Sequence, residues 1–185
     1  MTLFPLFRWV LLGLGAAGLP GCCANNVCDC DDANADAIEL RFSTTAAGPA
    51  GQPFAAVDLD TLVIQRSPLP YSPANKFETV TVYRGAAQVR DSVVLNNGTP
   101  FAQVGGTKLN GYRYLVQYLA HPAGAHGKKG VPTTAVVIDR VALSGALDGS
   151  GCCTCYTNTE KSVYLNGAAT PQDLRASNRL VITKP

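Results

Sequence analysis

Cysteine is the residue type in this sequence whose number and spacing point most directly to chemistry. The seven cysteines form two clusters far apart in the chain: Cys22, Cys23, Cys28 and Cys30, then Cys152, Cys153 and Cys155. Clustered thiols can form disulfides or, as thiolates, bind zinc, copper(I) or an iron–sulfur cluster. The compartment decides between these outcomes, because disulfides persist where the surroundings are oxidising.

The N-terminal residues carry an export signal. One cation, Arg8, precedes an apolar run from Trp9 to Leu19, and small residues then lead to Cys22, as in a secretory signal peptide. The run is too short for a permanent membrane helix, which needs roughly 20 apolar residues. Leu19-Pro20-Gly21-Cys22 resembles the lipobox of bacterial lipoproteins. Cys23 is a poorer acceptor, because its use would place Cys22 before the cleaved bond, where Gly21 fits better.

The lipobox resemblance implies a location and an anchor. Residues 1–21 would be removed, and Cys22 would carry a diacylglycerol on its thiol and an acyl chain on its amino group. Several acyl chains give stable anchoring, whereas one does not. We therefore expect a protein of the bacterial cell envelope, on the outer membrane, whose first partner is the membrane. We expect no cofactor apart from this covalent lipid.

The mature chain has the size and charge of one ordinary domain. Removing 21 of the 185 residues leaves 164, enough for a core of its own. Without Arg8, 14 lysines and arginines face 13 acidic residues. Because no basic block or stripe is present, we expect no nucleic-acid partner. The expected macromolecular partner is an unidentified envelope protein or glycan.

Residues 22–36 are small, polar and acidic, and we interpret them as a lipidated, Cys/Asp-rich tether. Over residues 37–185, apolar residues alternate with polar ones, as in half-buried strands. The predicted strands are Ala37–Ser43, Leu59–Arg66, Phe77–Arg84, Ser92–Leu95, Tyr112–Leu119, Thr134–Leu143, Ser162–Asn166 and Arg179–Thr183. The predicted core residues are Ile38, Leu40, Phe42, Val80, Val82, Val136, Ile138 and Leu180. The pattern predicts an all-β fold, a single antiparallel β-sandwich of immunoglobulin-like general architecture.

Turn signals separate these strands. Four dipeptides tolerate the positive φ of tight turns: Asn97-Gly98, Asn110-Gly111, Asp148-Gly149 and Asn166-Gly167. The one candidate for a helical turn lies near Pro171–Ala176, because proline can open a helix.

Six cysteines remain once Cys22 carries lipid, an even number in an oxidising compartment. Sequence alone allows 15 pairings. However, Cys28 and Cys30, like Cys153 and Cys155, are two residues apart, so each pair lies on one face of an extended strand. We predict that the two clusters face each other, with Cys28 or Cys30 bonded to Cys153 or Cys155. Cys23 and Cys152 would form the third pair.

Other residues allow alternative interpretations. Cys28, Cys30, Cys153 and Cys155 could bind a metal, but the usual C-x₂-C spacing and a nearby histidine are missing, so the primary prediction has no metal ligand. The acidic residues Asp29, Asp31, Asp32 and Asp36 could bind calcium, but we interpret them as a solvated tether. The histidines His121 and His126, near Lys128 and Lys129, could bind a metal or transfer protons, but we interpret them as part of a surface loop. The tyrosine stripe Tyr112, Tyr114 and Tyr118 could bind sugars or peptides, but we interpret it as a core face.

No catalytic constellation is visible, so no catalytic residue is assigned. The leading hypothesis is a non-enzymatic envelope lipoprotein that binds, scaffolds or is displayed. Two alternatives remain open: a metal-handling or redox lipoprotein that uses the cysteines, and an envelope-polymer hydrolase whose residues meet only in the fold.

Overall fold

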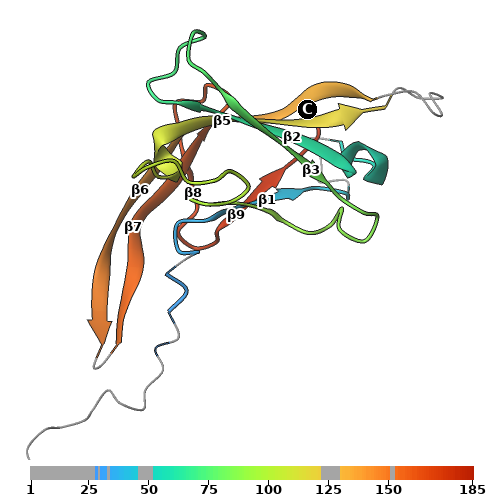
Figure 1. Cartoon of the computed structure of the whole chain (residues 1–185). Helices are drawn as coiled ribbons and strands as arrows, with labels where there is room; N and C mark the ends of the chain where they lie inside the picture. The colour runs from blue at the N-terminus through green and yellow to red at the C-terminus, as the bar shows by residue number, and fades with distance from the viewer. Residues whose placement is uncertain (1–27, 29, 33, 46–51, 122–129, 151–152) are drawn as a thin grey trace, which may run out of the picture.

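The computed structural model describes residues 28, 30–32, 34–45, 52–121, 130–150 and 153–185. The predicted signal, Cys22, Cys23 and Cys152 lie outside these residues. The fold is built of β-strands, as predicted, and no α-helix occurs among the described residues (Figure 1). The strands are β1 Ile38–Phe42, β2 Thr61–Pro68, β3 Glu78–Tyr83, β4 Val93–Leu95, β5 Tyr112–Ala120, β6 Val131–Ser150, β7 Cys153–Leu165, β8 Gln172–Asp173 and β9 Arg179–Ile182. Two 3₁₀ turns, Ala56–Leu59 and Leu109–Gly111, lie before β2 and β5.

The strands form two sheets. The larger has the order β3-β2-β5-β6-β7-β8, and all its neighbours are antiparallel. The smaller has the order β4-β1-β9. There β1 is antiparallel to β4 but parallel to β9, so the prediction of a wholly antiparallel fold is wrong at this pair.

Both sheets contribute to one hydrophobic core. The inward residues Ile38 and Leu40 of β1 are fully buried, and so are residues of β2, β5, β6 and β9. Phe54 lies between the sheets, with its ring edge-on to Phe42 of β1 at 5.4 Å and to Tyr118 of β5 at 5.1 Å between centroids. The tyrosine stripe Tyr112, Tyr114 and Tyr118 is buried, which confirms its interpretation as a core face.

The prediction of burial is confirmed for Ile38, Leu40, Phe42, Val136, Ile138 and Leu180. It is wrong for Val80 and Val82, which are only partly buried. Their strand, β3, is the outermost of the larger sheet and pairs only with β2. An edge strand has a neighbour on one side only, so its side chains keep more contact with water.

The largest difference from expectation is the length of the β6–β7 hairpin. Its strands span 20 and 13 residues, and their pairing continues to Ser150↔Cys153. Asp148 and Gly149, predicted to form a turn, instead lie inside β6 opposite Cys155 and Thr154. Residues 144–149 are all exposed, so no hydrophobic alternation marked them as a strand. We call residues 144–150 and 153–158 of the hairpin the arm; it projects from the body of the domain (Figure 1).

Of two further local predictions, one is confirmed and one is wrong. Asn166 and Gly167 have φ of 52° and 75°, so the predicted positive-φ turn after β7 is confirmed. This turn is held by the Asp139 carboxylate, which accepts a hydrogen bond from the Gly167 amide at 2.6 Å. The predicted helical turn near Pro171–Ala176 is wrong, because the short strand β8 lies there and places Leu174 in the core. No helix in the described residues has the length and apolar character needed to cross a membrane.

Truncating Ile138 should test the core. This residue is fully buried in β6 between β5 and β7. We expect Ile138→Ala to lower the free energy of unfolding by about 2–5 kcal/mol through lost burial and a residual cavity. Val131, in the same strand but 58% exposed, is the matched control: Val131→Ala should change stability by no more than about 0.5 kcal/mol. Urea unfolding measures both, and equal effects would contradict the assigned core.

Candidate functional site

Two disulfides join the start of the described chain to β7. Cys28 bonds Cys153 and Cys30 bonds Cys155, each with Cα atoms 5.4 Å apart and a sequence separation of 125. The prediction that the two clusters face each other is thus confirmed for these four cysteines. The predicted third pair, Cys23 and Cys152, lies outside the described residues. We call the two disulfides, with the chain around them, the clamp.

The described residues between Cys28 and Ala37 run beside β7 in the same direction. Beyond the disulfides, the Asp32 carboxylate accepts a hydrogen bond from the Tyr156 amide at 2.8 Å. Further along, the Asn158 side-chain amide donates to the Ala35 carbonyl at 2.7 Å. The offset between partners stays at 123–125 residues from Cys28 to Ala35. The segment therefore runs alongside the arm, as the blue trace beside β7 shows in Figure 1.

A buried lysine fixes the end of this segment where the arm meets the core. Lys161 is 1% exposed, and its Nζ donates to the carbonyls of Ala35 at 2.7 Å and Ala37 at 2.6 Å. It also donates to Asn178 Oδ1 at 2.7 Å. These three acceptors match the three donors of an ammonium group. Lys161 thus joins the segment that enters β1, the strand β7 and the residue that precedes β9.

Burial sets the electrostatics of the clamp. It lowers the pKa of Lys161, because desolvation disfavours the charged form, although Asp36 and Glu39 act in the opposite direction. In the arm, burial and then the Asp36 carboxylate raise the pKa of Tyr156. The Tyr156 ring covers Gly145 on the neighbouring strand, where a Cβ atom would also meet the Thr157 carbonyl at 2.8 Å. Glycine at this position lets the two strands of the arm pack closely.

The geometry favours disulfide chemistry at the cysteines. Cys30, Asp32 and Cys155 place candidate metal-ligand atoms within 4.8 Å of one another. The two sulfurs, however, are bonded to each other, and it is the thiolate that binds metals. Asp32 is instead used to hold the Tyr156 amide. The arrangement supports the disulfide interpretation over the alternative metal site.

The other sequence candidates lie apart from the clamp or outside the described residues. Asp31 is exposed, and its carboxylate accepts a hydrogen bond from the Asn34 side chain at 2.9 Å. His121 is partly buried just after β5. His126, Lys128, Lys129 and Asp29 fall outside the described residues.

Lys161 and its acceptor Asn178 were not predicted from the sequence. One signal was available: Lys161 stands two residues before Val163, which is fully buried, and alternate residues of a strand share a face. A lysine on the core face needs buried acceptors. The carbonyls that supply them come from residues that were interpreted as a solvated tether.

Neither a protein-family model, nor a curated protein, nor a solved structure matches this chain. The function is therefore inferred from the anchor motif and the clamp.

The two disulfides should stabilise the fold in a strongly non-additive way. Either one alone still closes the loop of 125 residues, so removing the other opens only a small ring. In the chain-entropy treatment, each single removal costs about 2 kcal/mol and removal of both costs about 7 kcal/mol. The comparison uses Cys28→Ser/Cys153→Ser, Cys30→Ser/Cys155→Ser and the combined variant in urea unfolding. All three carry Cys23→Ser and Cys152→Ser, so that no third bond closes the loop. A combined loss equal to the sum of the single losses would contradict the clamp.

Replacing Lys161 by methionine should expose the role of its ammonium group. Lys161→Met keeps an apolar side chain but leaves the Ala35, Ala37 and Asn178 oxygens without their donor. We expect a loss of about 1.5–3 kcal/mol in unfolding free energy. Lys76→Met, at an exposed position, is the matched control and should have little effect.

The difference in unfolding free energy between the wild type and Lys161→Met should depend on pH. Because burial lowers the pKa of Lys161, the unfolded chain binds more protons than the folded chain in the alkaline range below 10.5. The contribution of Lys161 to stability therefore rises with pH across that range. The advantage of the wild type over Lys161→Met should grow there; a constant difference would contradict the burial assigned to this lysine.

Proposed function

We propose that the protein is a lipid-anchored, non-enzymatic module of the bacterial cell envelope, held at its anchor by the clamp. The observation that carries this proposal is the position of the first disulfide. Cys28 follows the lipobox cysteine, Cys22, by six residues, and Cys28 is bonded to the arm. The clamp thus begins close to the anchor, in the segment that would otherwise serve as a flexible tether.

This spacing limits how far the arm can stand from the membrane. Six residues span at most about 22 Å when fully extended. Cys28 pairs with Cys153, close to the end of the arm, and the blue segment reaches that end in Figure 1. We propose that the arm points toward the membrane and that the body of the domain, with its smaller sheet, points away. The outer membrane is the proposed location, and an envelope protein or glycan the proposed partner.

We also propose that the two sheets form a sandwich of immunoglobulin-like general architecture, with residues 37–185 as the domain. Supporting this, both sheets contribute side chains to one core. The edge-on ring contacts of Phe54 with Phe42 and Tyr118 further link β1 of one sheet to β5 of the other. Such a module offers loops and sheet edges as binding surfaces rather than a deep catalytic cleft.

Proteolysis of the lipidated protein in vesicles tests the anchor and the clamp together. An endoproteinase that cuts before aspartate can cleave at Asp31 and Asp32, which are exposed. After such a cut, the lipidated peptide stays bonded to β7 through Cys28–Cys153. We expect the cut domain to remain with the vesicles and to leave them only when a reductant is added. Reductant without protease should release nothing.

The outcomes separate the two parts of the proposal. Release by protease alone would contradict the clamp. A protein that never associates with vesicles, or an N-terminal peptide without lipid on Cys22 in mass spectrometry, would contradict the anchor. Cys23→Ala is the matched control for Cys22→Ala: the first should keep the lipid and the second should lose it.

A further inference from the structure

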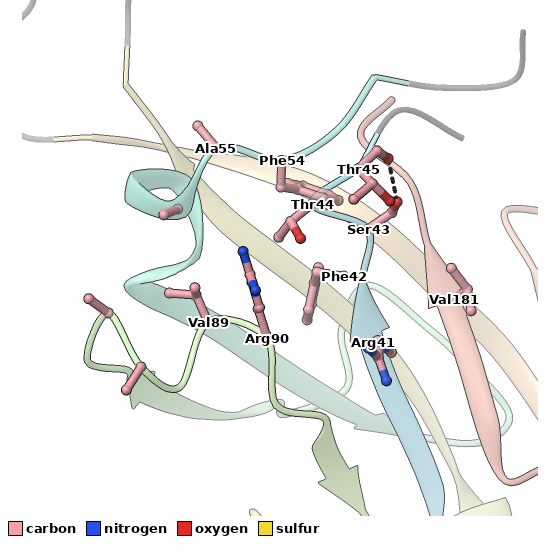
Figure 2. Close-up of a pocket in the computed structure, with 13 residues that line it drawn as sticks. Arg41, Phe42, Ser43, Thr44, Thr45, Phe54, Ala55, Val89, Arg90 and Val181 are labelled. Carbon is pink, nitrogen blue, oxygen red and sulfur yellow. Dashed lines mark hydrogen bonds between the residues drawn. The ribbon is translucent and has the colours of Figure 1, made fainter. Parts of the chain in front are cut away.

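An open groove lies at the C-terminal end of β1, and it shares no residue with the clamp. Its volume is about 960 Å³. Its walls come from the end of β1 and the residues after it, from Phe54–Ala56, and from the loop before β4 (Figure 2). The floor is apolar, because Phe42, Phe54 and Val89 are buried side chains of the core. The clamp and the core do not use the open side of this groove.

The charged side chains that line the groove are all positive. Among the described residues that line it, the charged ones are Arg41 and Arg90, and both are exposed. Neither side chain has a hydrogen bond or an ion pair within the described part of the chain. Arg90 projects into the space between Val89 and Phe42 in Figure 2. The nearby carboxylate of Asp58 is already paired with Lys184 at 2.8 Å. Two guanidinium groups are therefore available to an anion.

The backbone of β1 is also open on this side. The ladder between β1 and β4 ends at Leu40↔Val93, whereas the ladder with β9 continues to Phe42↔Ile182. On the β4 side, Phe42 thus has no strand partner, and the loop before β4 makes no backbone hydrogen bond to it in the described structure. The backbone groups of Arg41 face β9 instead, like those of Glu39 and Ser43. An unpaired strand edge is a site where an extended peptide can add by main-chain hydrogen bonds.

We propose that this groove binds an extended, acidic segment of a partner protein, which adds to the free edge of β1. The peptide backbone would pair with the free amide and carbonyl of Phe42. Its carboxylates would meet Arg41 and Arg90, whose planar guanidinium groups suit carboxylates in a two-bond geometry. Apolar side chains on the alternate positions would lie on Phe54 and Val89. The free strand edge favours a peptide over a glycan or a free anion, because only a peptide can continue the ladder.

The probe for this site is a fluorescent, end-capped peptide of alternating valine and glutamate, six residues long. Its binding to the full lipidated protein in detergent is followed by fluorescence anisotropy. Arg41→Gln/Arg90→Gln should weaken binding by about tenfold or more, as expected for lost charge-assisted hydrogen bonds. Lys76→Gln/Lys108→Gln makes the same change in net charge at exposed positions outside the groove and should leave the affinity unchanged. Circular dichroism of each variant confirms its fold.

Three further probes decide the ligand class. A valine–lysine peptide should not bind, and the valine–glutamate peptide with N-methylated backbone amides should bind at least about tenfold more weakly, because it cannot pair with β1. An oligogalacturonate supplies carboxylates without a peptide backbone and should bind more weakly than the acidic peptide. No binding of the acidic peptide, equal binding of its N-methylated form, tighter binding of the oligogalacturonate, or an unchanged affinity in the arginine variant would each overturn the proposal.

Discussion

The structure depends on a side-by-side alignment between residues 28–37 and β7. The arm is a two-stranded ribbon whose residues 144–149 are exposed, and an isolated hairpin of this kind is marginally stable in water. It has no core of its own to bury. The segment beside it supplies a third element, held by two covalent bonds and by the hydrogen bonds of Asp32 and Asn158. Without this alignment, neither the arm nor the entry of the chain into β1 would have a defined position.

Lys161 connects this alignment to the core. It lies at the point where exposed arm gives way to buried sheet, and its ammonium group takes its acceptors from the aligned segment and from Asn178. A buried ammonium group is costly unless its donors are satisfied. The aligned segment must therefore be in place for Lys161 to be accommodated. The disulfides and the lysine act on the same segment from its two ends.

Strands with one buried face were predictable from the sequence. The outer parts of strands with no buried face were not. Each of the eight predicted strands is present, because alternation of the kind seen at Ile38, Leu40 and Phe42 reports a half-buried surface. The outer parts of β6 and β7 are exposed and rich in small and polar residues, so they carry no such signal. The parallel pairing of β1 with β9 was also missed, since alternation reports a face but not a partner. The facing of the two cysteine clusters was predictable, because equal spacing within each cluster suits two bonds between them. Which cysteine bonds which was not predictable, because the spacing is the same for parallel and antiparallel strands. The groove beside β1 was not predictable either, because Arg41 and Arg90 are brought together only by the fold.

The clamp also decides which parts of the chain would carry a mechanical load. Tension applied at the N-terminal end would pass from Cys28 directly to Cys153, and from there along β7 toward the C-terminus. A parallel path runs through Cys30 and Cys155. Residues 31–152 lie off both paths, so β1 to β6 would bear none of the force along their own backbone. The load would reach them only sideways, through the ladder between β6 and β7 and through the contacts of the core. Most of the domain, including the groove, is thereby isolated from pulling at the end where the proposed lipid is attached.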